Sequence, residues 1–305
     1  GGALNGERSV SKRGGYCLFV GRLSEEKGVD LLFTARCESV GRLKIIGDGP
    51  LKSYVEEHST GNIQFLGRKE KYDEFNLMSR ADAERELAWQ VASSEELKNN
   101  FDYEKLDAEA KISYDIWQYQ TKQAVEADKY YKHAYVFTQM SGMQAFLTQF
   151  LINYHKVDQE SDMKAYNKRI GGVANALSNL LAQAKENAAF GVRPPRFAYQ
   201  GVIEQSQNVI TGQPFDDSEI DAPLWADAKT KVAALVENET ISPQPADKLL
   251  ATTKSQLMSV YQPAYQSLIS WFEADLVNTD EIATGVGKLP DGKAFYDTQL
   301  SHNTT

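Results

Sequence analysis

Two cations between two glycines are the feature of this sequence most suggestive of chemistry. Gly21-Arg22 and Lys27-Gly28 follow Tyr16–Val20, an apolar run that predicts a buried strand, and precede a segment with helical spacing. Open α/β sheets bind ligands at the carboxyl ends of their strands, and a helix N-terminus beside two cations favours a diphosphate. We therefore predict that Gly21, Arg22, Lys27 and Gly28 bind phosphate. The alternative is that Arg22 and Lys27 are solvated charges beside a turn.

The histidines do not have the spacing of a metal site. His58, His133, His155 and His302 include no pair separated by four residues, so no two of them lie on neighbouring turns of one helix face. The sequence also has no Gly-x-Ser-x-Gly elbow, no Gly-x-x-x-x-Gly-Lys-Ser/Thr loop and no Cys-x-x-Cys pair. We predict no catalytic residue and no metal ligand in this chain.

Two further groups of side chains have a structural and a functional interpretation. Arg193 and Arg196 flank two prolines, where they would either recognise a carboxylate or cap a helix end. Several aromatic residues recur at helical spacing and predict the packed core of a helical domain rather than a ligand site. These are Trp117, Tyr119, Phe137, Phe146, Phe150 and Tyr154.

The order of predicted elements changes near Asp82. Before it, the strands Tyr16–Val20, Leu43–Ile46 and Ile63–Leu66 alternate with helical segments, which indicates a parallel sheet. After it, the apolar periodicity predicts helices, with Gly171-Gly172 marking a kink or a close helix–helix contact. The predicted helices are Glu84–Lys98, Ala110–Lys122, Val125–Tyr154, Asp162–Asn187, Phe197–Val209, Pro223–Glu237, Pro243–Ser259 and Tyr261–Leu276.

Charge divides the 305 residues at the same place. The net charge is −9, with +2 in residues 1–81 and −11 in residues 82–305. An acidic chain without a basic stripe is not expected to bind nucleic acid. No apolar run is long enough to span a membrane, and no secretory signal is visible, so the default compartment is the cytoplasm and the true one stays unknown. Cys17 and Cys37 are expected to be reduced thiols, with a disulfide as the alternative.

Three motifs of the first part occur in an order that resembles a known family. They are Gly21–Gly28 (Gly-Arg-Leu-Ser-Glu-Glu-Lys-Gly), Lys44–Leu51 (Lys-Ile-Ile-Gly-Asp-Gly-Pro-Leu) and Ile63–Gly67 (Ile-Gln-Phe-Leu-Gly). Residues 16–81 thereby resemble the nucleotide-sugar-binding half of the family 4 glycosyltransferases, which have the GT-B fold. The resemblance implies that Arg22 and Lys27 contact the diphosphate of a UDP- or GDP-sugar donor. The Pro-Ser strand and Glu-x7-Glu region of that family do not follow, so sugar transfer is not expected.

Five separated motifs of the second part resemble a different family. They are Asp107–Tyr119, Met140–Gln144, Gly191–Phe197, Ile210–Phe215 and Val286–Gly292. The region from about Leu87 to Thr305 thereby resembles the N-terminal half of the domain-of-unknown-function family 885, long, mostly bacterial helical proteins similar to zinc metallopeptidases. In that family a His-Glu-x-x-Pro-Gly-His element of the C-terminal half would supply zinc ligands and the general base. This chain has no such element, so the resemblance implies zinc for the full-length parent and no cofactor here.

Together these patterns predict an α/β fragment, a partial Rossmann-like GT-B half, followed by a larger, mainly α-helical domain. The predicted domains are residues 1–81 and 82–305, with a junction between about Leu77 and Leu87. The leading hypothesis is a chimera of two fragments, in which both parent families are enzymes but both catalytic centres are incomplete. The second hypothesis is a family 885 hydrolase whose C-terminal half lies elsewhere and is the implied partner. The third is a nucleotide-sugar-binding module that uses the Arg22/Lys27 loop.

Overall fold

The structure, a computed structural model, describes residues 17–20, 43–46, 51–59, 63–65 and 73–304. The chain divides into two compact units, Gly1–Tyr72 and Asp73–Thr305, which are described one at a time. The second unit thus begins before the boundary predicted between Ala81 and Asp82, and the exact division into domains stays a prediction.

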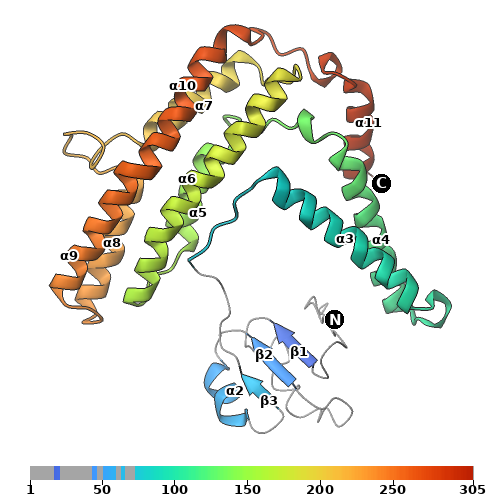
Figure 1. The fold of residues 1–305 in the computed structure, drawn as a ribbon, viewed down its shortest axis with the longest axis horizontal. Helices are drawn as coiled ribbons and strands as arrows, with labels where there is room; N and C mark the ends of the chain where they lie inside the picture. The colour runs from blue at the N-terminus through green and yellow to red at the C-terminus, as the bar shows by residue number, and fades with distance from the viewer. Residues whose placement is uncertain (1–16, 21–42, 47–50, 60–62, 66–72, 305) are drawn as a thin grey trace. The chain divides into compact units, whose positions relative to one another are not determined.

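The described part of the first unit is a small parallel sheet with one helix. Strands β1 (Cys17–Val20), β2 (Leu43–Ile46) and β3 (Ile63–Phe65) pair in the order β1-β2-β3, and helix α2 (Lys52–His58) connects β2 to β3 (Figure 1). Ile45 of this unit is fully buried. The apolar runs of the sequence therefore mark these strands to within a residue.

The predicted fold class is nevertheless wrong. A Rossmann-like half needs an extended sheet covered by helices on both faces, whereas the strands that the structure describes have only four, four and three residues. Among the described residues no α/β half of the GT-B kind is seen, and apart from these three short strands their regular structure is helical. Short apolar runs show where strands begin and end, but they do not show how many strands join a sheet.

The second unit consists of helices joined by loops and single 3₁₀ turns (Figure 1). These are α3 (Arg80–Asn100), α4 (Ala108–Asp128), α5 (Met143–Tyr154), α6 (Glu160–Ala189), α7 (Arg196–Val209), α8 (Pro223–Glu237), α9 (Pro243–Gln256), α10 (Gln262–Asp275) and α11 (Gly292–Asn303). A π-helical turn, Leu257–Tyr261, links α9 to α10.

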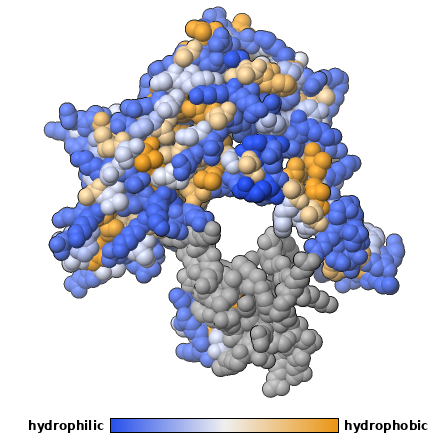
Figure 2. Space-filling model, in the orientation of Figure 1, coloured by the Kyte–Doolittle hydropathy of each residue, from blue (hydrophilic) through white to orange (hydrophobic). Residues whose placement is uncertain are grey.

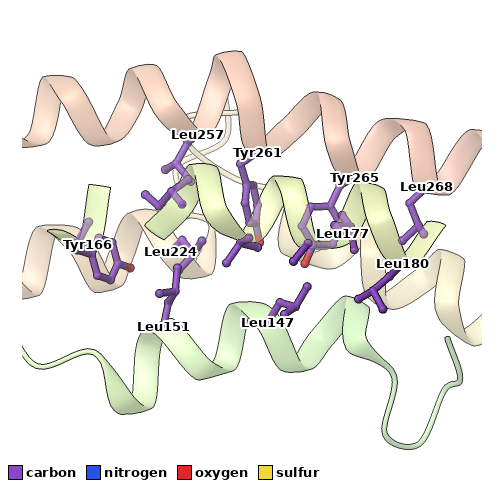
Figure 3. Close-up of a cluster of buried hydrophobic side chains, with 14 of the residues drawn as sticks. Leu147, Leu151, Tyr166, Leu177, Leu180, Leu224, Leu257, Tyr261, Tyr265 and Leu268 are labelled. Carbon is purple, nitrogen blue, oxygen red and sulfur yellow. The ribbon is translucent and has the colours of Figure 1, made fainter. Parts of the chain in front are cut away.

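Helices α5 to α10 enclose one hydrophobic core. Leu147 of α5, Tyr166 and Leu177 of α6, Tyr261 of the π-helical turn and Tyr265 of α10 converge there, and each of these side chains is fully buried (Figure 3). Burying an aliphatic or aromatic side chain of this size stabilises a fold by roughly 1.5–3 kcal/mol. This core, shared by six helices, holds the second unit together.

An extended segment before α3, residues 73–79, packs along α6. Phe75 lies directly over Gly172, where an added Cβ atom would be 2.4 Å from the Phe75 Cβ atom. Asn179 of α6 donates a hydrogen bond to the Leu77 carbonyl oxygen at 2.7 Å. Gly172 therefore lies against this extended segment, whereas Gly171 faces α9, where an added Cβ atom would be 3.5 Å from Gln256 Oε1.

Two predicted helix boundaries are wrong. The expected helix Val125–Tyr154 is broken, because α4 ends at Asp128 and α5 begins only at Met143, after an irregular stretch that buries Phe137 in the core. The expected break near Ser259 is absent, because the π-helical turn joins α9 and α10. In both places tertiary packing decided the outcome over local periodicity.

Candidate functional site

Gly21, Arg22, Lys27 and Gly28 all lie outside the described residues. Their role in binding a nucleotide-sugar diphosphate stays a prediction. Cys37 also lies outside, so the state of the two cysteines stays a prediction as well.

Two histidines are buried and bonded within the helical unit. His133 Nε2 lies 2.5 Å from the Pro290 carbonyl oxygen. His155 Nε2 lies 2.9 Å from the Asp162 carbonyl oxygen, and Arg169 Nη1 lies 3.1 Å from His155 Nδ1. Because a guanidinium only donates, His155 Nδ1 is an acceptor and its proton sits on Nε2. Burial, reinforced by the charge of Arg169, lowers the pKa of His155 to about 4.

The remaining histidines lie on other elements. His58 Nδ1 is 2.7 Å from the Tyr54 carbonyl oxygen in α2, and His302 Nε2 of α11 is 4.0 Å from a Glu126 carboxylate oxygen. Within the described residues, no group of three or more His, Cys, Asp or Glu side chains is arranged to hold a metal ion. The residues that the structure places therefore do not fit the zinc that the family 885 resemblance implies for the full-length parent.

Arg193 is used inside the protein. Its guanidinium donates two hydrogen bonds to the Asp275 carboxylate, at 2.8 and 3.1 Å, and one to the Ala188 carbonyl oxygen in the last turn of α6, at 2.8 Å. Burial by itself raises the pKa of Asp275, but hydrogen bonds from Arg193, Asn278 and Tyr199 lower it overall. The helix-capping interpretation of Arg193 is thus confirmed, and the carboxylate that it binds belongs to the same chain.

A chain of hydroxyl groups crosses the core beside the π-helical turn. Thr148 Oγ1 lies 2.5 Å from the Tyr261 hydroxyl and 3.1 Å from the Tyr265 hydroxyl, which donates to the Gln144 carbonyl oxygen at 2.6 Å. Burial raises the pKa of both tyrosines, so they stay neutral. Since these side chains are fully buried, the network stabilises the core and has no access to a substrate.

A surface groove of about 420 Å³ lies between α6 and α9 and contains three lysines. Lys164 pairs with Glu160 at 2.8 Å, and Lys168 pairs with Asp73 at 2.5 Å. Lys248 also lines the groove. Because carboxylates neutralise two of the three cations, the groove offers little net positive charge to an anion.

The α3–α4 hairpin, residues 80–128, adds no side chain to the hydrophobic core of α5 to α10. In these two fully described helices, Ser94 and Thr121 are the only buried residues. The helices meet through a hydrogen bond from Ser94 to Gln118 at 2.8 Å and through an edge-on contact between Trp89 and Trp117. The contact that holds α3 against α4 is therefore small and partly polar.

One side of α4 carries an apolar stripe without a covering element. Ile112, Ile116 and Tyr119, hereafter the α4 stripe, are 60%, 50% and 55% exposed. Their spacing places them on one face of the helix, opposite the face with Trp117, Gln118 and Thr121. Figure 2 shows apolar residues on the surface of the helical unit among hydrophilic ones. The α4 stripe is the feature of the described surface that best fits an interaction site.

Comparison with known proteins places the chain in a family. The sequence model of a family described as "Bacterial protein of unknown function (DUF885)" matches residues 62–305, which is most of the chain. The chain belongs to this family. The match supports the DUF885 part of the predicted resemblance and gives no support to a glycosyltransferase half or to a chimera. It also runs across the junction predicted between Leu77 and Leu87.

A solved structure has the same fold as this DUF885 protein. It is titled the crystal structure of the putative lipoprotein from Colwellia psychrerythraea, with a TM-score of 0.64 and 17% sequence identity. The likeness covers 75% of this chain and 39% of that chain, so the chain spans about two-fifths of the length of the solved protein. No curated protein matches the sequence. No helix among the described residues is long and apolar enough to cross a membrane.

Sequence reasoning missed the exposed face of the hairpin. Phe137 is buried as predicted, but Tyr119, Phe146 and Tyr154, also predicted as core residues, are 55%, 47% and 68% exposed. The spacing of Ile112, Ile116 and Tyr119 was the available signal, since apolar residues at positions i, i+4 and i+7 share a helix face. That spacing is the same for a face that meets the core and for one that faces solvent.

Proposed function

We propose that this chain is the helical, non-catalytic part of a hydrolase of the metallopeptidase type, and that a further part of the same protein carries the catalytic centre. In this proposal the helices of the second unit form a rigid scaffold and a docking surface for the catalytic part. Its described residues contain no group of side chains arranged to hold a metal ion, so the proposal assigns the zinc site to the further part.

The observation that carries the proposal is the α3–α4 hairpin. Two helices of 21 residues each bury one residue apiece, while the α4 stripe is left open. A hairpin of this length is only marginally stable by itself, since most helical stability in proteins comes from packing an apolar face. Membership of the DUF885 family and the greater length of the solved relative support the idea that another segment covers it.

The buried ionisable groups of the helical unit support a scaffold role. Arg193 is paired with Asp275, and Lys231 is paired with Asp227, which also accepts a hydrogen bond from Tyr166 at 2.8 Å. Arg193 thereby joins the end of α6 to the end of α10, and the Tyr166–Asp227 hydrogen bond joins α6 to α8. Such a scaffold would position a catalytic segment without taking part in the reaction.

The test begins with the source DNA, read past the codon for Thr305. We expect an in-frame continuation with a His-Glu-x-x-Pro-Gly-His element. The joined protein should hydrolyse peptides, lose that activity with a chelator and regain it with Zn²⁺, while this chain alone should be inactive. A continuation without the element, or a zinc-loaded joined protein that cleaves no member of a peptide and ester library, would overturn the proposal.

A further inference from the structure

We infer that the α4 stripe is a docking surface for a helical segment with an apolar face and a basic rim, supplied by the rest of the longer protein. This inference rests on the proposed function, in which the chain is one part of that protein. It adds the place of contact and the chemistry of the partner.

The geometry of α4 favours a helix as the occupant. Ile112, Ile116 and Tyr119 follow the spacing by which amphipathic helices present anchor residues to an apolar partner. All three side chains are at least half exposed, whereas Trp117 on the opposite side contacts Trp89 of α3. An apolar stripe of this kind normally faces a core, so an uncovered one marks an interaction site.

The net charge of the hairpin favours a basic partner. The α3–α4 hairpin contains twelve Asp and Glu and six Lys and Arg, a net charge of −6 out of −9 for the whole chain. Opposite potentials favour encounter between two surfaces, whereas like charges placed together cost several kcal/mol. A partner with Lys and Arg around its apolar face is therefore favoured over a second copy of this acidic hairpin.

The length of the related structure indicates where the partner lies. The fold likeness extends over 75% of this chain but only 39% of the solved lipoprotein. The larger part of a protein with this fold thus lies outside the matched region. A segment joined to the same chain would meet α4 at high effective concentration, so even a modest apolar contact would hold it.

The experiment compares one substitution in two settings. Ile116→Lys is made in this chain and in the longer protein obtained by joining the chain to its in-frame continuation. In the chain alone, where Ile116 is half exposed, we expect the melting temperature to stay within about 1 °C. In the longer protein we expect it to fall by at least about 2 °C, because a lysine would enter an apolar contact with a basic rim.

Ile282→Lys is the matched control, because Ile282 is 78% exposed and lies outside the hairpin. It should leave both melting temperatures unchanged. The inference would be overturned if Ile116→Lys changed the melting temperature equally in the chain alone and in the longer protein. It would also be overturned if a stop codon followed directly after the codon for Thr305. Sedimentation showing a dimer of the chain alone that Ile116→Lys dissociates would also overturn it, since a second copy would then be the occupant.

Hydrolysis is measured separately on the same longer protein. If Ile116→Lys destabilises the longer protein but that protein hydrolyses nothing, the docking surface is supported and the hydrolase proposal is rejected. If the longer protein hydrolyses peptides but Ile116→Lys does not change its stability, the hydrolase proposal is supported and the docking surface is rejected.

Discussion

Arg193 binds Asp275 through two hydrogen bonds, from Nε to Oδ2 at 2.8 Å and from Nη2 to Oδ1 at 3.1 Å. The pair joins the loop before α7 to the end of α10, two elements that are 82 residues apart in sequence. The Asp275 side chain is 10% exposed. An ion pair in this setting stabilises the fold mainly because neither charge is left alone in the interior.

Removing the Asp275 charge is therefore predicted to destabilise the protein. We expect Asp275→Asn to lower the free energy of unfolding by about 2–4 kcal/mol, because the amide carries no charge and leaves only one acceptor oxygen for the hydrogen bonds that Arg193, Tyr199 and Asn278 donate. Glu281→Gln is the control, because the Glu281 side chain pairs with Arg196 but is 78% exposed, and it should cost less than about 0.5 kcal/mol. Urea denaturation measures both, and equal losses would contradict the structural role of Asp275.

His155 is predicted to make stability depend on pH. Its pKa in the fold is about 4, against about 6.5 in an unfolded chain, so the unfolded state takes up a proton first as the pH falls. Stability contributed by neutral His155 is full above pH 6.5 and is lost as the pH falls toward 4, by about 3 kcal/mol in total.

The measurement is the free energy of unfolding between pH 7 and pH 4, for the parent and for His155→Gln. Glutamine does not titrate, so the variant should show a shallower pH dependence even if it is less stable throughout. The lowered pKa values of Asp128 and Asp275 place their losses below this window. Parallel curves for the two proteins would rule out His155 as the source.

The contact between Phe75 and Gly172 gives a prediction with a neighbour as control. Gly172→Ala should destabilise the protein by about 1–3 kcal/mol, because the new methyl group overlaps Phe75. In Gly171→Ala the new methyl group would contact only Gln256 Oε1, at 3.5 Å. This substitution should therefore leave the stability of the protein unchanged or raise it by up to about 1 kcal/mol, because alanine has the higher helix propensity. Thermal unfolding of the two variants compares them directly, and the same sign for both would show that Phe75 is not held against α6.

The Arg22/Lys27 loop remains a prediction from sequence that a titration can test. UDP or GDP affinity should fall at least about tenfold in the double variant Arg22→Ala plus Lys27→Ala, because two charge-assisted hydrogen bonds are lost. The double variant Lys69→Ala plus Lys71→Ala removes the same charge from the same region and should leave affinity within about twofold. An unchanged affinity in the first variant, or no measurable binding by the parent, would dismiss the loop as a nucleotide site.

The sequence by itself determined the features that depend on neighbours along the chain. Turn residues and apolar runs located the strands from Cys17 to Phe65, and Pro243 marked the first position of α9, because its fixed φ angle and missing N–H suit that place. The five helical motifs were enough to indicate the family that the comparison then showed.

Only the tertiary structure decided which of these local features assemble, and into what. Three strands did not make a Rossmann-like half, because sheet size depends on pairing between distant segments. The predicted helix Val125–Tyr154 is interrupted between Asp128 and Met143, a stretch in which Phe137 is buried in the core. The α4 stripe was readable as an apolar helix face, but periodicity shows only which residues share a face. Whether a neighbour covers that face depends on long-range packing, and in the described chain nothing covers Ile112, Ile116 and Tyr119.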